Sequence, residues 1–164
     1  DLKEIKPDPI KWRILSVNED GTDAFLLADQ ALDCKPYNDT MTDVTWETCT
    51  LRSWLNEDFY RTAFNDAQKA NIETSELIYD KRSEGGSYTY DVNTITDKIF
   101  MLSYAQATNP DYGFTSDIAA SDSRVAFSTD YAACQGLPAF QSANSSWRLP
   151  TSFLVKAAAQ EGGN

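Results

Sequence analysis

Alternating apolar and polar side chains near the start of the chain predict a β-hairpin. The alternation covers much of residues 10–17, and a second apolar run covers residues 24–28. The segment between them, residues 18–21, reads Asn-Glu-Asp-Gly, and Asn, Asp and Gly are typical of tight turns. We therefore predict two antiparallel strands joined by this turn.

A long loop and then a helical region are predicted next. Residues 33–48 contain Pro, Asn and Asp without periodicity, and loops of this length in small domains are often functional. From Thr50 onward apolar residues recur at helical spacing, which predicts two short helices. Asn65 or Asp66 is placed to cap a further helical turn over residues 67–71.

The middle of the chain predicts shorter elements. Residues 72–79 have a mixed pattern, and the polar run 80–94 predicts a surface excursion with a solvated hairpin tip. A buried strand is predicted at residues 98–102, followed by a helical turn at 104–108. An alternative in which tyrosines of the excursion contact a partner stays open; these are Tyr79, Tyr88 and Tyr90.

The last part of the chain predicts an irregular stretch, two helices and a strand. Residues 109–123 are irregular, Ser128 or Thr129 opens a helix over 130–135, a strand covers 146–149, and a helix runs from Thr151 through Ala159. Short strands and short helices without a regular strand–helix–strand alternation predict an α+β fold, with short antiparallel strands and long loops. We expect a single domain over residues 1–164.

Composition supports one core and argues against a membrane span. The chain has 164 residues, of which 41% are hydrophobic and 12% aromatic, enough for the core of one domain. No stretch approaches the roughly 18 consecutive apolar residues of a membrane-spanning helix, so no membrane insertion by this domain is expected. Its first residues, Asp1-Leu2-Lys3-Glu4, are unlike a signal peptide, so any targeting segment was removed or never existed.

The charge of the chain argues against nucleic acid as a partner. Its 14 Lys and Arg against 25 Asp and Glu give a net charge of −11, which repels a phosphate backbone and an anionic lipid surface. The acidic residues are spread along the chain, as expected for a solvated surface that keeps a protein soluble.

The side chains offer little catalytic chemistry. The chain contains no histidine, the commonest general base and transition-metal ligand, and no motif gives its serines another base. The loop carboxylates, Asp39 with Asp43 and Asp111 with Asp117, lack the spacing of a calcium-binding loop. We therefore expect a protein that is not an enzyme and that uses no metal or cofactor.

Three cysteines leave the redox compartment open. Cys34, Cys49 and Cys134 lack the C-x-x-C spacing of zinc and redox sites. We expect buried free thiols, with a disulfide between Cys34 and Cys49 as the alternative.

Candidate binding residues come from the densest group of distinctive side chains. Trp46 ends the predicted loop, and with Glu47 and Arg52 it could stack on a sugar or clamp a peptide. In the alternative, Trp46 belongs to the core and Arg52 satisfies loop carbonyls. The full candidate set is Tyr37, Trp46, Glu47, Arg52, Trp147 and Arg148.

Six motifs follow one another between about Ile10 and Thr151: Tyr37-Asn38 after Asp33, Thr45-Trp46-Glu47-Thr48, Leu51-Arg52-Ser53-Trp54-Leu55-Asn56, Phe59-Tyr60 with Ala63-Phe64, Thr96-Asp97-Lys98-Ile99-Phe100-Met101-Leu102-Ser103, and Ser146-Trp147-Arg148-Leu149. Together they resemble an uncharacterised bacterial domain family that recurs in secreted and surface proteins of gut-associated bacteria. Such domains usually begin with an extra strand and end with a strand resembling Gly-Val-Arg-Pro-Ala. Neither is visible here, so the chain could be a fragment, a processed form or a divergent member.

A second resemblance concerns the end of the chain. Arg148-Leu149-Pro150-Thr151, followed by Ala158-Ala159, is similar to a segment of formylglycine-generating-enzyme-like domains. This resemblance implies a C-type-lectin-like fold. It does not extend to the oxidase activity, because no motif places that enzyme's catalytic cysteine pair on the cysteines of this chain.

These observations lead us to expect a non-catalytic binding or adhesion module of a bacterial surface or secreted protein, located outside the cell or at its surface. Its loops 33–48 and 109–123 would be presented to a glycan or protein ligand. The alternative is a structural spacer or accessory domain of a larger surface protein, and an enzyme comes third.

Overall fold

The computed structural model describes residues 9–81, 91–116, 121–137 and 153–158, and its architecture is α+β. Its main sheet has five antiparallel strands in the order β1-β2-β9-β4, with β7 also paired to β9. The predicted hairpin is confirmed as β1 (Trp12–Val17) and β2 (Asp23–Ala28), with a register shift between Ile14 and Ser16.

The strand β9 (Phe153–Ala158) lies in the middle of this sheet, so the helix predicted from Thr151 through Ala159 is wrong. One edge of β9 pairs with β2, and its other edge pairs with β7 (Ile99–Met101) and β4 (Ile72–Glu73). The alanines that favoured a helix are overridden because both edges of the segment find hydrogen-bonding partners. A short apolar run is also the pattern of a strand inside a sheet.

The helical region predicted from Thr50 is confirmed, but it forms one continuous segment rather than two short helices. This segment consists of α1 (Thr50–Trp54), the π-helical turn η1 (Leu55–Phe59) and α2 (Tyr60–Ala63). The next helix, α3 (Asp66–Asn71), begins at the predicted cap: the Asn65 side chain accepts the Gln68 backbone N–H at 2.9 Å, and the Gln68 side chain accepts the Asn65 N–H at 2.9 Å.

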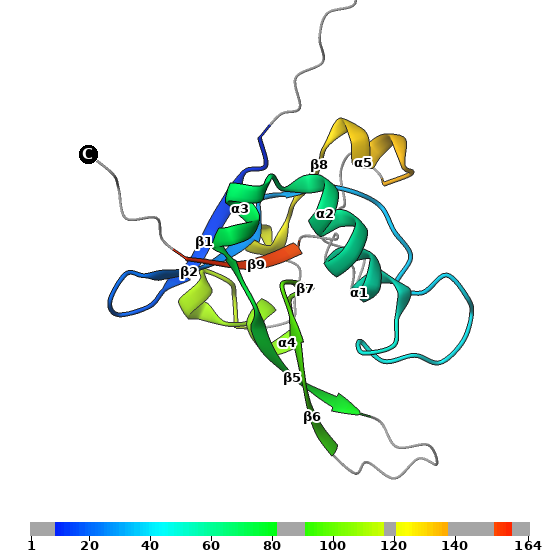
Figure 1. Cartoon of the computed structure of the whole chain (residues 1–164), viewed down its shortest axis with the longest axis horizontal. Coiled ribbons are helices and arrows are strands. Elements are labelled where there is room, and N and C mark those ends of the chain that lie inside the picture. The colour runs from blue at the N-terminus through cyan, green and yellow to red at the C-terminus, as the bar shows by residue number, and fades with distance from the viewer. Residues whose placement is uncertain (1–8, 82–90, 117–120, 138–152, 159–164) are drawn as a thin grey trace, which may run out of the picture.

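The two faces of the sheet carry separate apolar clusters. Helices α1, α2 and α3 lie on one side of the sheet, and α4 (Tyr104–Ala107) lies on the other (Figure 1). Neighbouring residues of β7 belong to different clusters, because successive side chains of a strand point to opposite faces of the sheet. Ile99 packs under the helices, whereas Phe100 packs in the second cluster.

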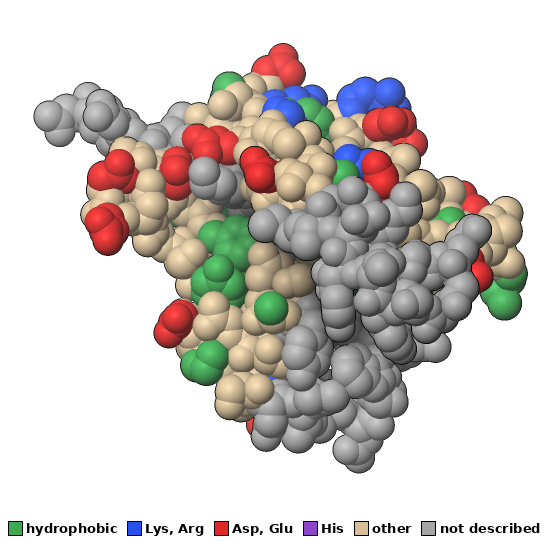
Figure 2. Space-filling model, turned by 90° about the horizontal axis from the view of Figure 1, so that it is seen from below, with side chains coloured by type: hydrophobic (Ala, Val, Ile, Leu, Met, Phe, Trp, Pro, Cys, Tyr) green, Lys and Arg blue, Asp and Glu red, His purple; other side chains and the backbone are tan. Residues whose placement is uncertain are grey.

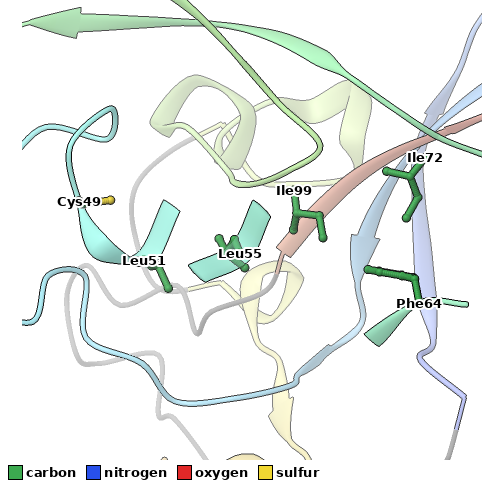
Figure 3. Close-up of a cluster of buried hydrophobic side chains, with 6 residues drawn as sticks. All are labelled: Cys49, Leu51, Leu55, Phe64, Ile72 and Ile99. Carbon is green, nitrogen blue, oxygen red and sulfur yellow. The ribbon is translucent and has the colours of Figure 1, made fainter. Parts of the chain in front are cut away.

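The helix-side cluster forms the larger core. Figure 3 shows side chains of the helical segment and the sheet meeting in it, with Leu55 beside Ile99. Both are fully buried. The cluster consists of Cys49, Leu51, Leu55, Phe64, Ile72 and Ile99, and the second cluster of Leu15, Leu27, Phe100 and Phe114.

A second hairpin, β5 (Ser75–Lys81) and β6 (Asp91–Asp97), projects away from the main sheet (Figure 1). The predicted surface excursion is therefore in part regular: residues 80–81 and 91–94 belong to these strands. Tyr88 and Tyr90 lie outside the described residues. Two short strands that the pattern did not predict, β3 (Gln30–Ala31) and β8 (Phe127–Ser128), pair in parallel.

The remaining elements are short. The helical turn α4 follows Ser103, whose hydroxyl accepts the Gln106 N–H at 3.2 Å. The helix α5 (Asp130–Cys134) is capped by Thr129, one of the two predicted caps. The stretch predicted as irregular over 109–123 contains two 3-10 turns, η2 (Pro110–Tyr112) and η3 (Asp122–Arg124). The predicted loop 33–48 contains no helix or strand. The strand predicted at 146–149 lies outside the described residues.

All three thiols are free, but they differ in burial. Cys49 is buried as predicted, Cys34 is half-buried, and Cys134 is exposed, so the prediction of buried thiols is wrong for Cys134. Among the described residues, no helix is long and apolar enough to cross a membrane.

Candidate ligand-binding groove

Trp46 and Arg52, two of the predicted binding residues, are held by one buried carboxylate. The side chain of Asp97, at the end of β6, is only 2% exposed. Its Oδ2 atom accepts the indole Nε1–H of Trp46 at 2.8 Å, and Arg52 Nε lies 2.8 Å from Oδ1 and 3.0 Å from Oδ2. Charge-assisted bonds of this kind are stronger than neutral ones. They fasten the loop 33–48 and the helix α1 to the second hairpin.

Arg52 also holds loop carbonyls, which was the structural alternative for this side chain. One terminal nitrogen donates to the Glu47 carbonyl oxygen at 3.1 Å, and the other donates to the Thr96 carbonyl oxygen at 3.4 Å. Trp46 is half-buried and packs against both apolar clusters. The geometry around Trp46 and Arg52 therefore fits a role in joining elements.

Asn56, in the π-helical turn, makes a second connection to the same segment. Its Oδ1 accepts the backbone N–H of Lys98 at 2.8 Å and of Ile99 at 3.2 Å, and its Nδ2 donates to the Ile99 carbonyl at 2.9 Å. The amide side chain thus supplies a donor and an acceptor to β7, as a neighbouring strand would. The distinctive motifs around Arg52 and Asp97 are explained by these connections.

The other predicted binding residues lie near this junction or outside the described chain. Glu47 is exposed and follows Trp46 in the loop. Tyr37 is 44% exposed, and its ring centroid lies 6.4 Å from that of Trp46. Trp147 and Arg148 lie outside the described residues. The structure thus brings Tyr37, Trp46, Glu47 and Arg52 together.

Tyr37 has an ionisation that can be tested. Burial raises the pKa of Tyr37 above its ordinary value of 10.0, and the neighbouring Cys49 adds to this rise. The folded protein therefore keeps the phenolic proton at a pH at which the unfolded chain has lost it. This contribution to stability is fully present below about pH 10 and is lost as pH rises toward the pKa of the folded state.

We expect replacement of Tyr37 by phenylalanine to make the protein less sensitive to alkali. The decrease in free energy of unfolding between about pH 9 and about pH 11 should be smaller in Tyr37→Phe than in the unchanged protein, by a modest amount because Tyr37 is partly exposed. Urea unfolding at each pH measures this, with pH 7 as the common reference. Parallel profiles for the two proteins would contradict the expectation.

A groove lies on the other side of the sheet, and none of the predicted candidate residues that the structure describes lines it. It has a volume of about 470 Å³, within the roughly 300–1,000 Å³ typical of small-molecule sites. One wall comes from the β1–β2 hairpin and the other from the start of β5, while β7, α4 and η2 close it between them. Figure 2 shows hydrophobic side chains gathered in a hollow on this face.

Aromatic rings form the floor of the groove. The rings of Phe25 and Phe100 are stacked with their centroids 5.9 Å apart, and the ring of Tyr112 is tilted against Phe25 at 5.6 Å. Phe100 is buried, whereas Phe25 and Tyr112 are half-buried and so present part of their surface. Leu77 extends this apolar floor onto β5.

Polar and acidic side chains border these rings. The carboxylate of Asp23 comes from the β2 wall and that of Glu76 from the β5 wall. The groove is lined by Ser16, Val17, Asn18, Asp23, Ala24, Phe25, Thr74, Ser75, Glu76, Leu77, Phe100, Gln106 and Tyr112. An apolar floor with a few polar groups at its border can hold an organic ligand and fix its orientation.

The β1–β2 turn beside the groove is built by its own side chains. Asn18 Oδ1 accepts the Asp23 N–H at 2.9 Å, and the Asp20 carboxylate accepts the Thr22 hydroxyl at 2.7 Å and the Thr22 N–H at 3.1 Å. The hydrogen bonds from Thr22 lower the pKa of Asp20 below its ordinary range. This carboxylate therefore stays charged at mildly acidic pH.

A metal site does not account for this region. In the part of the chain that the structure describes, no three Cys, Asp or Glu side chains come together in a way that could hold a metal ion. The groove is better suited to an organic ligand that contacts rings and polar groups at once.

Sequence reasoning missed the groove because its residues come from six separate elements. Only Tyr112 falls within a loop that the sequence singled out, the stretch 109–123. The signal that was available is the pair of aromatic residues Phe25 and Phe100, each in a predicted strand, with the acidic residue Asp23 two positions before Phe25.

Together, the fold and the groove define a small α+β domain with an open, aromatic-floored site. The chain belongs to the family described as Domain of unknown function (DUF6273), whose sequence profile matches residues 21–160. No curated protein and no solved structure matches the chain.

Proposed function

We propose that this domain is a non-catalytic binding module and that its ligand, a glycan, lies in the groove. The observation that carries the proposal is the combination of a ring floor, Phe25 and Tyr112, with polar side chains on both walls. Sugars offer apolar C–H faces that pack on rings and hydroxyl groups that need hydrogen-bonding partners. A groove with both kinds of surface suits them.

The proposal includes a place for the domain and a finer description of its fold. Short helices, small antiparallel sheets and the loop 33–48 are compatible with a C-type-lectin-like fold. The resemblance of the sequence motifs to domains of bacterial secreted and surface proteins supports a location outside the cell or at its surface. A binding or adhesion role suits both this fold and this location.

The carboxylates of the groove support binding rather than catalysis. Hydrolysis of a glycosidic bond needs a pair of carboxyl groups, one of which is kept protonated, usually by an apolar environment. Glu76 is exposed and Asp23 is only half-buried, so water reaches both. The chain also contains no histidine, the commonest general base.

Removing the Tyr112 ring is expected to weaken glycan binding about fivefold or more. The ring supplies contact area on the open side of the floor, and an aromatic contact contributes about 1 kcal/mol or more. The domain is first screened on an array of bacterial and host oligosaccharides, and the best binder is then titrated calorimetrically into the unchanged protein and Tyr112→Ala.

Tyr131→Ala is the matched control, because Tyr131 is an exposed tyrosine, at 59%, in α5 and outside the groove. It should leave the affinity unchanged, and circular dichroism should show that both variants are folded. The proposal fails if no oligosaccharide binds, or if Tyr131→Ala weakens binding as much as Tyr112→Ala. A protein ligand is the alternative that a pull-down from surface extracts would then reveal.

A further inference from the structure

We infer that the glycan bound in the groove carries a protonated amino group, so that the domain selects an amino sugar over its N-acetylated form. This inference rests on the proposed function and adds the charge of the ligand to it. It follows from the signs of the charges that line the groove and from the aromatic floor beneath them.

The charged groups among the described lining residues are all acidic. Asp23 and Glu76 belong to the lining, whereas none of the described lining residues is lysine or arginine. In Figure 2 most of the visible Lys and Arg side chains lie away from the hollow, and acidic side chains stand on the surface around it. A uronic acid or a phosphorylated sugar would be repelled here, and a neutral sugar would leave this charge unused.

The two carboxylates come from opposite walls. Asp23 is the first residue of β2, and Glu76 lies near the start of β5. An ammonium group bound in the groove lies near both of these lining residues, and two carboxylates of the same sign attract it together. A single acidic residue on an exposed strand would give much weaker selection.

The turn beside the groove reinforces the same sign of potential. It carries Glu19 and Asp20 next to the lining residue Asn18. The hydrogen bonds from Thr22, which lower the pKa of Asp20, keep this carboxylate ionised. With a net charge of −11 for the whole chain, the groove lies in a field that attracts cations and raises their local concentration.

The floor favours the same ligand. The faces of aromatic rings attract cations, and they do so more strongly where water is excluded. Phe25 and Tyr112 present such surface between the two acidic walls. An N-acetyl group at the same position of the sugar removes the charge and adds bulk, so it loses both contributions.

Two oligosaccharides that differ only in N-acetylation provide the test. The two ligands are the trimer of β-1,4-linked glucosamine and the trimer of N-acetylglucosamine. Both are titrated at about pH 5.5, because this pH lies below the pKa of an amino group, about 7.7–8.0 for an α-amino group, and so keeps the amines protonated. We expect the glucosamine trimer to bind about tenfold more tightly, and we expect this preference to shrink as salt is added.

Glu76→Gln should reduce the preference for the glucosamine trimer severalfold, because it removes one carboxylate from the lining while keeping the shape of the side chain. Glu57→Gln is the matched control, since Glu57 is an exposed glutamate in the π-helical turn and does not line the groove. It removes the same charge from the chain, and it should leave the preference in place. Equal effects of the two variants would attribute the preference to net charge alone and overturn the inference.

Two further results separate this inference from the proposed function. If both trimers bind equally and Tyr112→Ala weakens both, the inference is overturned while the proposed function stands. If neither trimer binds but trilysine does, with nuclear magnetic resonance shifts at groove residues, then both the amino-sugar inference and the glycan proposal fail.

Discussion

Replacing Asp97 by alanine is expected to lower the free energy of unfolding by about 3 kcal/mol, a decrease of about 6–12 °C in Tm for a domain of this size. The carboxylate is buried, with 2% of its side chain exposed, and it accepts hydrogen bonds from both Trp46 and Arg52. Without it, the Arg52 charge and the Trp46 indole N–H lose their partner in a partly buried place. Urea unfolding followed by tryptophan fluorescence measures the loss.

Asp58→Ala is the matched control for this substitution. Asp58 also pairs with an arginine, Arg61, at 2.6 Å, but 60% of the Asp58 side chain and 72% of the Arg61 side chain are exposed. An exposed pair contributes about 0–1 kcal/mol, so this variant should unfold almost as the unchanged protein does. The structural role of Asp97 is refuted if the two aspartate variants lose similar stability.

The role of Asp97 also explains why Trp46 and Arg52 were ambiguous from sequence. Each stands in a distinctive motif, and an aromatic ring beside an arginine is typical of both ligand sites and structural junctions. Their shared partner lies more than forty positions away along the chain: Trp46 and Asp97 differ by 51, and Arg52 and Asp97 by 45. Local patterns carry no information about such a pairing, whereas the contact itself decides the geometry.

Elements defined by local chemistry could be predicted well. The Asn-Glu-Asp-Gly turn placed the first hairpin, and the Asn65 cap and the Thr129 cap placed the starts of α3 and α5. These signals act within a few residues, through side chains that bond to the nearby backbone. The continuous helical segment was divided wrongly, because the π-helical turn shifts its apolar stripe out of the usual spacing.

The groove shows the opposite situation. Its floor requires Phe25 from β2, Phe100 from β7 and Tyr112 from η2 to meet on one face. That meeting depends on β9, which joins β2 to β7 in the sheet. Since β9 was predicted as a helix, the sheet could not be assembled from sequence and its second face could not be recognised as a site.

Replacing Val155 by proline is expected to lower the free energy of unfolding by about 3 kcal/mol or more, and so to remove much of the stability of a domain of this kind. Val155 pairs with Leu26 of β2 on one side and with Ile99 of β7 on the other. Proline has no backbone N–H to donate and is poorly tolerated inside a sheet. Thermal unfolding, or the soluble yield if the variant fails to fold, measures the effect.

Val155→Ala provides the comparison that separates a strand from a helix. Alanine keeps the backbone N–H, so the difference in stability between the proline and alanine variants measures the cost of losing the hydrogen bond between strands. Alanine also favours a helix over a strand. In a strand this substitution should destabilise the protein, but far less than proline does; in a helix it would stabilise it. Close Hα–Hα contacts between Val155 and its partners in nuclear magnetic resonance spectra would mark the antiparallel pairing directly. A stabilised alanine variant, together with the lack of these contacts, would remove β9 from the sheet and with it the link that brings the groove's rings together.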